Sequence, residues 1–130
     1  MKTVNAKKII WHLRYLLLVA ALSLSNCLTL HAQENKVVKL SPQKLKAFEG
    51  RYVFQFQPGQ NAYLQITAKE DHLMVKEMWT GNEMKFVPTS ELDFYHKERT
   101  FPLKFTKDSK GVVTHVLAFN RDLWTKEVGK

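Results

Sequence analysis

The segment RYVFQFQ at residues 51–57 decides the fold. Tyr52, Phe54 and Phe56 alternate mainly with polar residues, and this period of two is typical of a strand with one buried face. Pro58 and Gly59 follow directly, and these residue types suit the two central positions of a type II turn. The segment therefore predicts a strand whose chain turns back into an antiparallel neighbour.

The chain beyond this turn repeats the pattern. Short apolar runs are separated by turn residues such as Thr80-Gly81-Asn82 and Asp108-Ser109-Lys110-Gly111. Short connections make neighbouring strands antiparallel, and strands spaced about 8–12 residues apart favour a sandwich or an up-and-down barrel. No segment is long enough for a βαβ crossover. Seven further strands are predicted, at residues 62–69, 72–78, 84–87, 92–96, 100–106, 112–120 and 123–128.

One helical turn is predicted before the first strand. Ser41 is a good N-cap, and Pro42 fits the first helical turn, where a missing N–H costs nothing. Leu45 and Phe48 are three residues apart and share one face of this helix. Gly50 is suited to end it.

The first 32 residues are typical of a secretory signal peptide. Four basic residues and no acidic ones precede the apolar run LLLVAALSL at residues 16–24, and small and polar residues follow. The run is shorter than the roughly 20 apolar residues of a membrane span. Cleavage after Ala32 would make Gln33 the new N-terminus, and residues 33–39 are expected to be a flexible lead to a domain at 40–130.

Cys27 offers an alternative way of processing the same segment. Leu24-Ser25-Asn26-Cys27 is similar to the lipobox of bacterial lipoproteins, in which the cysteine is acylated, although Asn26 departs from that pattern. Acylation of Cys27 would tether the domain to a membrane surface, and it is the only route to a membrane that we expect. Cys27 is the single cysteine, so no disulfide within the chain is expected.

The net charge gives little support to nucleic-acid binding. Of 20 basic residues four lie in the predicted signal, while all 12 acidic residues follow it, so the remainder carries 16 minus 12, or +4. Its lysines are scattered singly along the chain, whereas a nucleic-acid footprint is a cluster of basic residues on one face. We therefore expect no nucleic acid among the partners.

The apolar spacing from residue 40 to residue 119 carries a family resemblance. Its motifs are Leu40-Ser41-Pro42-x-x-Leu45-x-x-Phe48-x-Gly50-x-Tyr52, Leu73-x-Val75, Phe86-x-Pro88 leading to Phe94, and Leu103-x-Phe105-x-x-Asp108-x-x-Gly111. This pattern resembles a lipocalin-like domain of unknown function that is usually attached to the C-terminus of β-lactamase-related serine hydrolases. The resemblance implies an eight-stranded antiparallel up-and-down barrel with the helical turn capping one end. The Lys-Thr-Gly element of the hydrolase is absent from the sequence, and its one Ser-x-x-Lys match, at residues 41–44, falls at the predicted helix cap, so the activity of the hydrolase is not carried over.

No arrangement typical of a catalytic or metal site stands out in the sequence. The three serines beyond residue 33 fall at predicted caps or turns. His72, His96 and His115 fall on three different strands without metal-ligand spacing. Glu91 and Asp93 share one strand face rather than opposing each other across a cleft. We expect no enzymatic activity, no metal and no cofactor.

The inward-facing aromatic residues are the most suggestive feature. An eight-stranded barrel is just wide enough either to be filled by side chains or to hold one small ligand, and the sequence leaves both open. Ala62, Ala68 and Ala118 are the only small residues that would leave a gap. The candidates for lining a ligand site are Tyr52, Phe54, Phe56, Phe94 and Phe105.

The sequence leaves open the role of two tryptophans and the inner face of one strand. Trp79 and Trp124 lie near predicted strand ends, where they would form a partner-binding surface or cap the barrel. The strand at 112–120 has two plausible inner faces, one starting at Val112 and one at Val113, and a bulge would switch between them.

Together these features predict an exported, periplasmic or extracellular, non-enzymatic accessory domain. On this hypothesis it associates with another exported protein, for which a serine hydrolase is the candidate. The alternative is a carrier of a small apolar ligand in the barrel interior.

Overall fold

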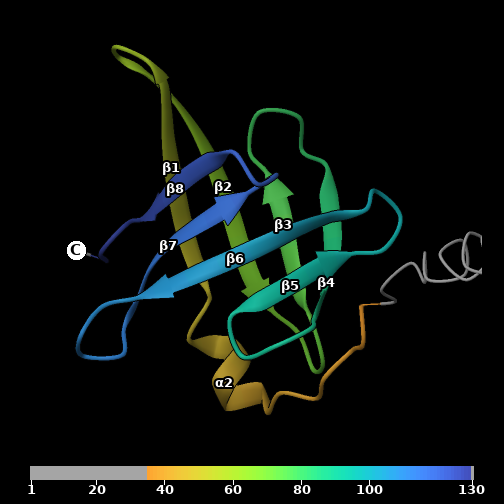
Figure 1. The fold of residues 1–130 in the computed structure, drawn as a ribbon. Coiled ribbons are helices and arrows are strands. Elements are labelled where there is room, and N and C mark those ends of the chain that lie inside the picture. The colour runs from red at the N-terminus through yellow and green to blue at the C-terminus, as the bar shows by residue number, and fades with distance from the viewer. Residues whose placement is uncertain (1–34, 130) are drawn as a thin grey trace, which may run out of the picture. The chain divides into compact units, whose positions relative to one another are not determined.

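The alternating segments form a closed sheet. The structure is a computed structural model that describes residues 35–129. Its strands are joined in the order β1 to β8, with β8 pairing back onto β1, and every neighbouring pair is antiparallel (Figure 1). The predicted eight-stranded up-and-down barrel is confirmed, and the sandwich is excluded. The predicted signal at 1–32 and its Cys27 lie outside the described residues.

The strand bounds agree closely with the predicted segments. Each predicted strand corresponds to one observed strand, with ends that differ by a few residues. The strands are β1 (Gly50–Gln57), β2 (Gln60–Ala68), β3 (Leu73–Glu77), β4 (Glu83–Pro88), β5 (Asp93–His96), β6 (Phe101–Lys107), β7 (Val113–Ala118) and β8 (Asp122–Lys126).

Helix α2 (Pro42–Lys46) covers one end of the barrel, which we call the lower end (Figure 1). The Ser41 hydroxyl accepts a hydrogen bond from the Lys44 amide at 3.3 Å, and Pro42 lies in the first turn, as predicted. Leu45 and Phe48 are fully buried below the strands. The opposite, upper end carries the turns at 58–59, 78–82, 97–100 and 119–121.

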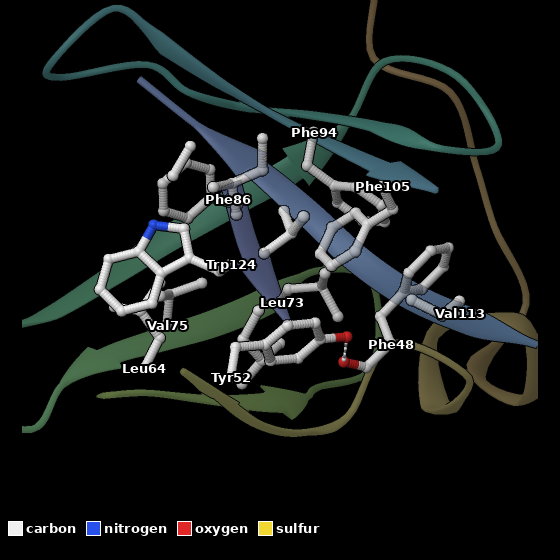
Figure 2. Packing of buried hydrophobic residues seen from close by; sticks show 14 of the residues in the cluster. Phe48, Tyr52, Leu64, Leu73, Val75, Phe86, Phe94, Phe105, Val113 and Trp124 are labelled. Carbon is white, nitrogen blue, oxygen red and sulfur yellow. Dashed lines mark hydrogen bonds between the residues drawn. The ribbon is translucent and has the colours of Figure 1, made fainter. Parts of the chain in front are cut away.

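The lower half of the interior is filled by aromatic side chains. The Phe48 ring lies 5.0 Å from the Phe94 ring and 4.6 Å from the Phe105 ring, between ring centroids. The Tyr52 hydroxyl donates a 2.8 Å hydrogen bond to the Phe48 carbonyl (Figure 2). This bond joins the first strand to the segment that closes the barrel below it.

Strand β7 combines both of its predicted inner faces. The pairing with β6 moves from His115 opposite Thr106 to Val113 opposite Lys107, which leaves Thr114 as an extra residue. Val113 is buried before this bulge, and Val116 is buried after it. The bulge therefore switches the inward face, because one added residue inverts the alternation of side chains.

Part of the expected flexible lead is held against the barrel. Within residues 35–39, the Val38 amide donates a 2.9 Å hydrogen bond to the Pro88 carbonyl, and the Val38 side chain packs on the core. Leu40 is buried just beyond it. In the stretch from residue 35 to residue 129, no helix is long and apolar enough to cross a membrane.

The Tyr52–Phe48 bond gives a first prediction. Tyr52→Phe should lower the free energy of unfolding by about 1–2 kcal/mol, because a buried carbonyl loses its donor. Urea unfolding measures the change. Tyr95→Phe is the matched control, since no hydrogen bond to its hydroxyl is found among the described residues. Equal stability of Tyr52→Phe and the unaltered chain would contradict a structural role for the bond.

A second prediction concerns alkaline pH. Burial raises the pKa of the Tyr52 hydroxyl well above its usual value. The unfolded chain loses this proton near pH 10 and the folded chain keeps it, so stability falls as the pH rises above about 10. This group contributes at most about 1.4 kcal/mol per pH unit. Urea unfolding between about pH 9 and pH 11 should show a shallower decline for Tyr52→Phe, and identical slopes would contradict the assignment.

Candidate functional site

The barrel closes incompletely where its first and last strands meet. The register between β1 and β8 consists of two pairs, Tyr52 with Lys126 and Val53 with Thr125. Beyond Val53, β1 continues to Gln57 along β2, and the described register gives it no further partner on β8. In Figure 1 the β1–β2 hairpin extends past its neighbours at the upper end. The barrel is therefore open at its upper end, between β1 and β8.

A pocket of about 610 Å³ occupies this opening, and we call it the seam pocket. Its lining is dominated by aromatic side chains, with a few polar groups at one side. The residues that line it are Phe54, Phe56, Asn61, Ala62, Trp79, Phe119, Arg121, Asp122 and Trp124. A volume in this range suits a drug-sized ligand.

Two stacked tryptophans form part of the seam-pocket lining. Trp124 projects inward from β8 and is 3% exposed, while Trp79 belongs to the 78–82 turn and is 54% exposed. Their rings are nearly parallel, with centroids 6.0 Å apart, and Phe54 packs on Trp124 at 5.3 Å. Trp124 thus forms the buried floor of the seam pocket, and Trp79, stacked on Trp124, is the exposed member of the pair.

The Trp124 indole N–H is buried without a hydrogen-bond partner among the described residues. Figure 2 shows its nitrogen among apolar side chains of the core cluster. Such a donor costs about 1–3 kcal/mol when it is left unpaired. The packing around Trp124 must offset this cost.

Phe119 is held in a strained conformation at the opposite wall. Its φ is +57°, that of the following Asn120 is +54°, and the Arg121 amide donates to the Ala118 carbonyl. Two successive positive φ angles define a type I′ turn, which favours glycine and asparagine over a bulky ring. The contact between Phe119 and Phe101, at 4.5 Å between centroids, holds the ring at the pocket.

One ion pair lies at the polar side of the seam pocket. Arg121 Nε and Nη2 donate to the two carboxylate oxygens of Asp122 at 2.9 and 3.2 Å. The hydrogen bonds to Asp122 raise the pKa of Arg121 above its usual value. The Asp122 side chain is 17% exposed and that of Arg121 is 80% exposed, so the guanidinium is the accessible member of the pair.

The candidate ligand-lining residues divide between two regions. Phe54 and Phe56 line the seam pocket, whereas Tyr52, Phe94 and Phe105 belong to the filled lower core. Their alternation gives the face of each strand but not the height along the barrel axis. The sequence did not identify three polar residues of the lining, Asn61, Arg121 and Asp122. Single polar residues in or beside turns are common on any protein surface, so their positions do not indicate a binding site.

The three histidines do not come together. His96 is buried between Phe86 and Phe101, with ring centroids 5.3 and 5.4 Å away. His72 contacts the Asp71 carboxylate at 2.6 Å, and this hydrogen bond lowers the pKa of Asp71. His115 contacts the Thr114 hydroxyl. Within residues 35–129 no group of three or more acidic, histidine or cysteine side chains is placed to hold a metal ion.

Comparison with known proteins adds nothing to this geometry. The chain matches no protein-family model, no curated protein and no solved structure.

The strained turn gives a third prediction. Phe119→Gly should be more stable than Phe119→Ala by about 1–2 kcal/mol, because both lose the ring and only alanine keeps the cost of a left-handed side chain. Urea unfolding of the two variants measures this difference. An alanine variant as stable as the glycine variant would contradict strain at this position.

Proposed function

We propose that the chain is an exported, non-enzymatic binding domain that holds a small apolar ligand in the seam pocket. The observation that carries this proposal is an aromatic-lined cavity of about 610 Å³ that opens to solvent beside a filled core. Binding sites for small molecules are usually concave and mainly apolar, with a few polar groups that orient the ligand. Export rests on the sequence features of residues 1–32.

The lining supports an apolar ligand rather than a polar one. Phe54, Phe56 and Phe119 present ring surfaces around a floor made by Trp124. Phe56 and Trp79 are about half exposed, so a ligand that covers them removes apolar surface from water. Burial of apolar surface stabilises a complex by roughly 25 cal/mol per Å² before the costs of association are subtracted.

The charged groups of the seam pocket support binding rather than catalysis. Acid–base catalysis needs a titratable group whose pKa lies near the working pH and which is available to the substrate. The two titratable groups of the seam pocket, Arg121 and Asp122, are paired with each other through two hydrogen bonds.

A fourth prediction tests the proposed ligand site with N-phenyl-1-naphthylamine, a neutral probe that fluoresces in apolar surroundings. Trp79→Ala should weaken its binding about tenfold, since a stacked ring contributes about 1.5 kcal/mol. Ala62→Trp should abolish binding at the seam pocket by filling it. Fluorescence titration measures both effects.

The control for the filling variant is Gln65→Trp. Gln65 lies on β2 between the buried residues Leu64 and Ile66, so its side chain points away from the barrel interior. This variant should bind the probe as the unaltered chain does. Probe binding that survives unchanged in Ala62→Trp would contradict the proposed site.

A second candidate function is association with another exported protein. It is favoured by the half-exposed Met78 and Trp79, which adjoin in the 78–82 turn, because tryptophan and methionine are enriched in the cores of interfaces. On this proposal the chain is an accessory domain, and the resemblance of residues 40–119 makes a serine hydrolase the candidate partner. Native mass spectrometry of the protein from its own cell envelope should then show a second chain, which Trp79→Ala should release.

A further inference from the structure

Arg121 is positioned to bind an anion at the edge of the seam pocket. Its guanidinium has five N–H donors, and the hydrogen bonds to Asp122 use the side formed by Nε and Nη2. For the rest of this guanidinium no hydrogen bond is found among residues 35–129. The end formed by Nη1 and Nη2 is therefore available, and its two parallel donors match the geometry of a carboxylate.

Asp122 makes this end more selective. The bidentate pair orients the guanidinium beside the pocket, with the Nη1–Nη2 end directed away from Asp122. Both Asp122 oxygens already accept from Arg121, and the carboxylate is the less exposed partner. An anion therefore finds the guanidinium exposed, whereas the carboxylate of Asp122 is largely covered.

Two of the four turns at the upper end carry charged residues. The four turns contain Lys97, Arg99 and Arg121 as cations and Glu98 as the only acidic residue. Glu83 and Asp122 directly follow two of these turns and offset this excess, so the attraction for an anion comes from the Arg121 guanidinium itself. The aromatic lining, in contrast, requires a ligand whose body is apolar.

We propose that the ligand of the seam pocket is an amphipathic carboxylate. Its apolar body lies against Phe54, Phe119 and Trp124, and its carboxylate accepts two hydrogen bonds from the free end of Arg121. This inference rests on the proposed function, because it names the ligand class of the same pocket.

The experiment compares decanoate with decan-1-ol, two ligands with the same chain length that differ in the head group. Each displaces N-phenyl-1-naphthylamine from the full chain at neutral pH, where decanoate is ionised. Decanoate should displace the probe at a concentration about tenfold lower, as expected for one charge-assisted interaction. Arg121→Gln should remove this preference.

Lys85→Gln is the matched control, because it removes the same charge from an exposed position on β4. It should keep the preference for decanoate. Equal displacement by the two ligands in the unaltered chain would overturn the carboxylate proposal while probe binding still supports the pocket. A preference that survives in Arg121→Gln, or that disappears in Lys85→Gln, would also overturn it. Failure of the probe to bind would remove both proposals.

Discussion

The short pairing between β1 and β8 is the constraint on which the upper half of this structure depends. A barrel closes only where its first and last strands share hydrogen bonds, and here the closure consists of two residue pairs, Tyr52 with Lys126 and Val53 with Thr125, and of a 2.8 Å hydrogen bond that the Glu127 amide donates to the Arg51 carbonyl. Above these pairs the register gives β1 no further partner on β8, and aromatic side chains of both strands line the opening between them. The seam pocket lies at this opening, and Trp124 lies between it and the core.

The lower end is closed by a helix rather than by strand pairing. Helix α2 brings Phe48 beneath the strands, and the hydrogen bond from Tyr52 fixes the Phe48 carbonyl to β1. Lys126, opposite Tyr52 on β8, donates from Nζ to the Ala47 carbonyl at 3.0 Å. The same pair of strands therefore anchors the helical plug at one end and diverges at the other. A chain built in this way combines a rigid core with one accessible cavity.

Much of this fold follows from the sequence, because the period-two pattern directly reports which face of a strand is buried. The Ser41 cap and the turn at Pro58 and Gly59 were predictable for the same local reason. Height along the barrel axis was not, so Phe94 in the core and Phe56 at the opening looked equivalent. The bulge of β7 and the end of the β1–β8 register depend on contacts between distant strands. The ion pair of Arg121 with Asp122 could not be predicted from the sequence, since charged residues beside a turn are ordinarily solvated.

Mapping of amide and indole N–H chemical shifts while N-phenyl-1-naphthylamine is added tests the central claim most directly. The claim is that the upper opening between β1 and β8, and not the filled lower half of the barrel, is the binding site. The account predicts the largest shifts at the indole N–H groups of Trp79 and Trp124 and at the amides of Phe54 and Phe119, with Phe94 and Phe105 unmoved. Shifts centred on Phe94 and Phe105 would contradict it, because they would place the ligand in the half of the barrel that is filled by side chains.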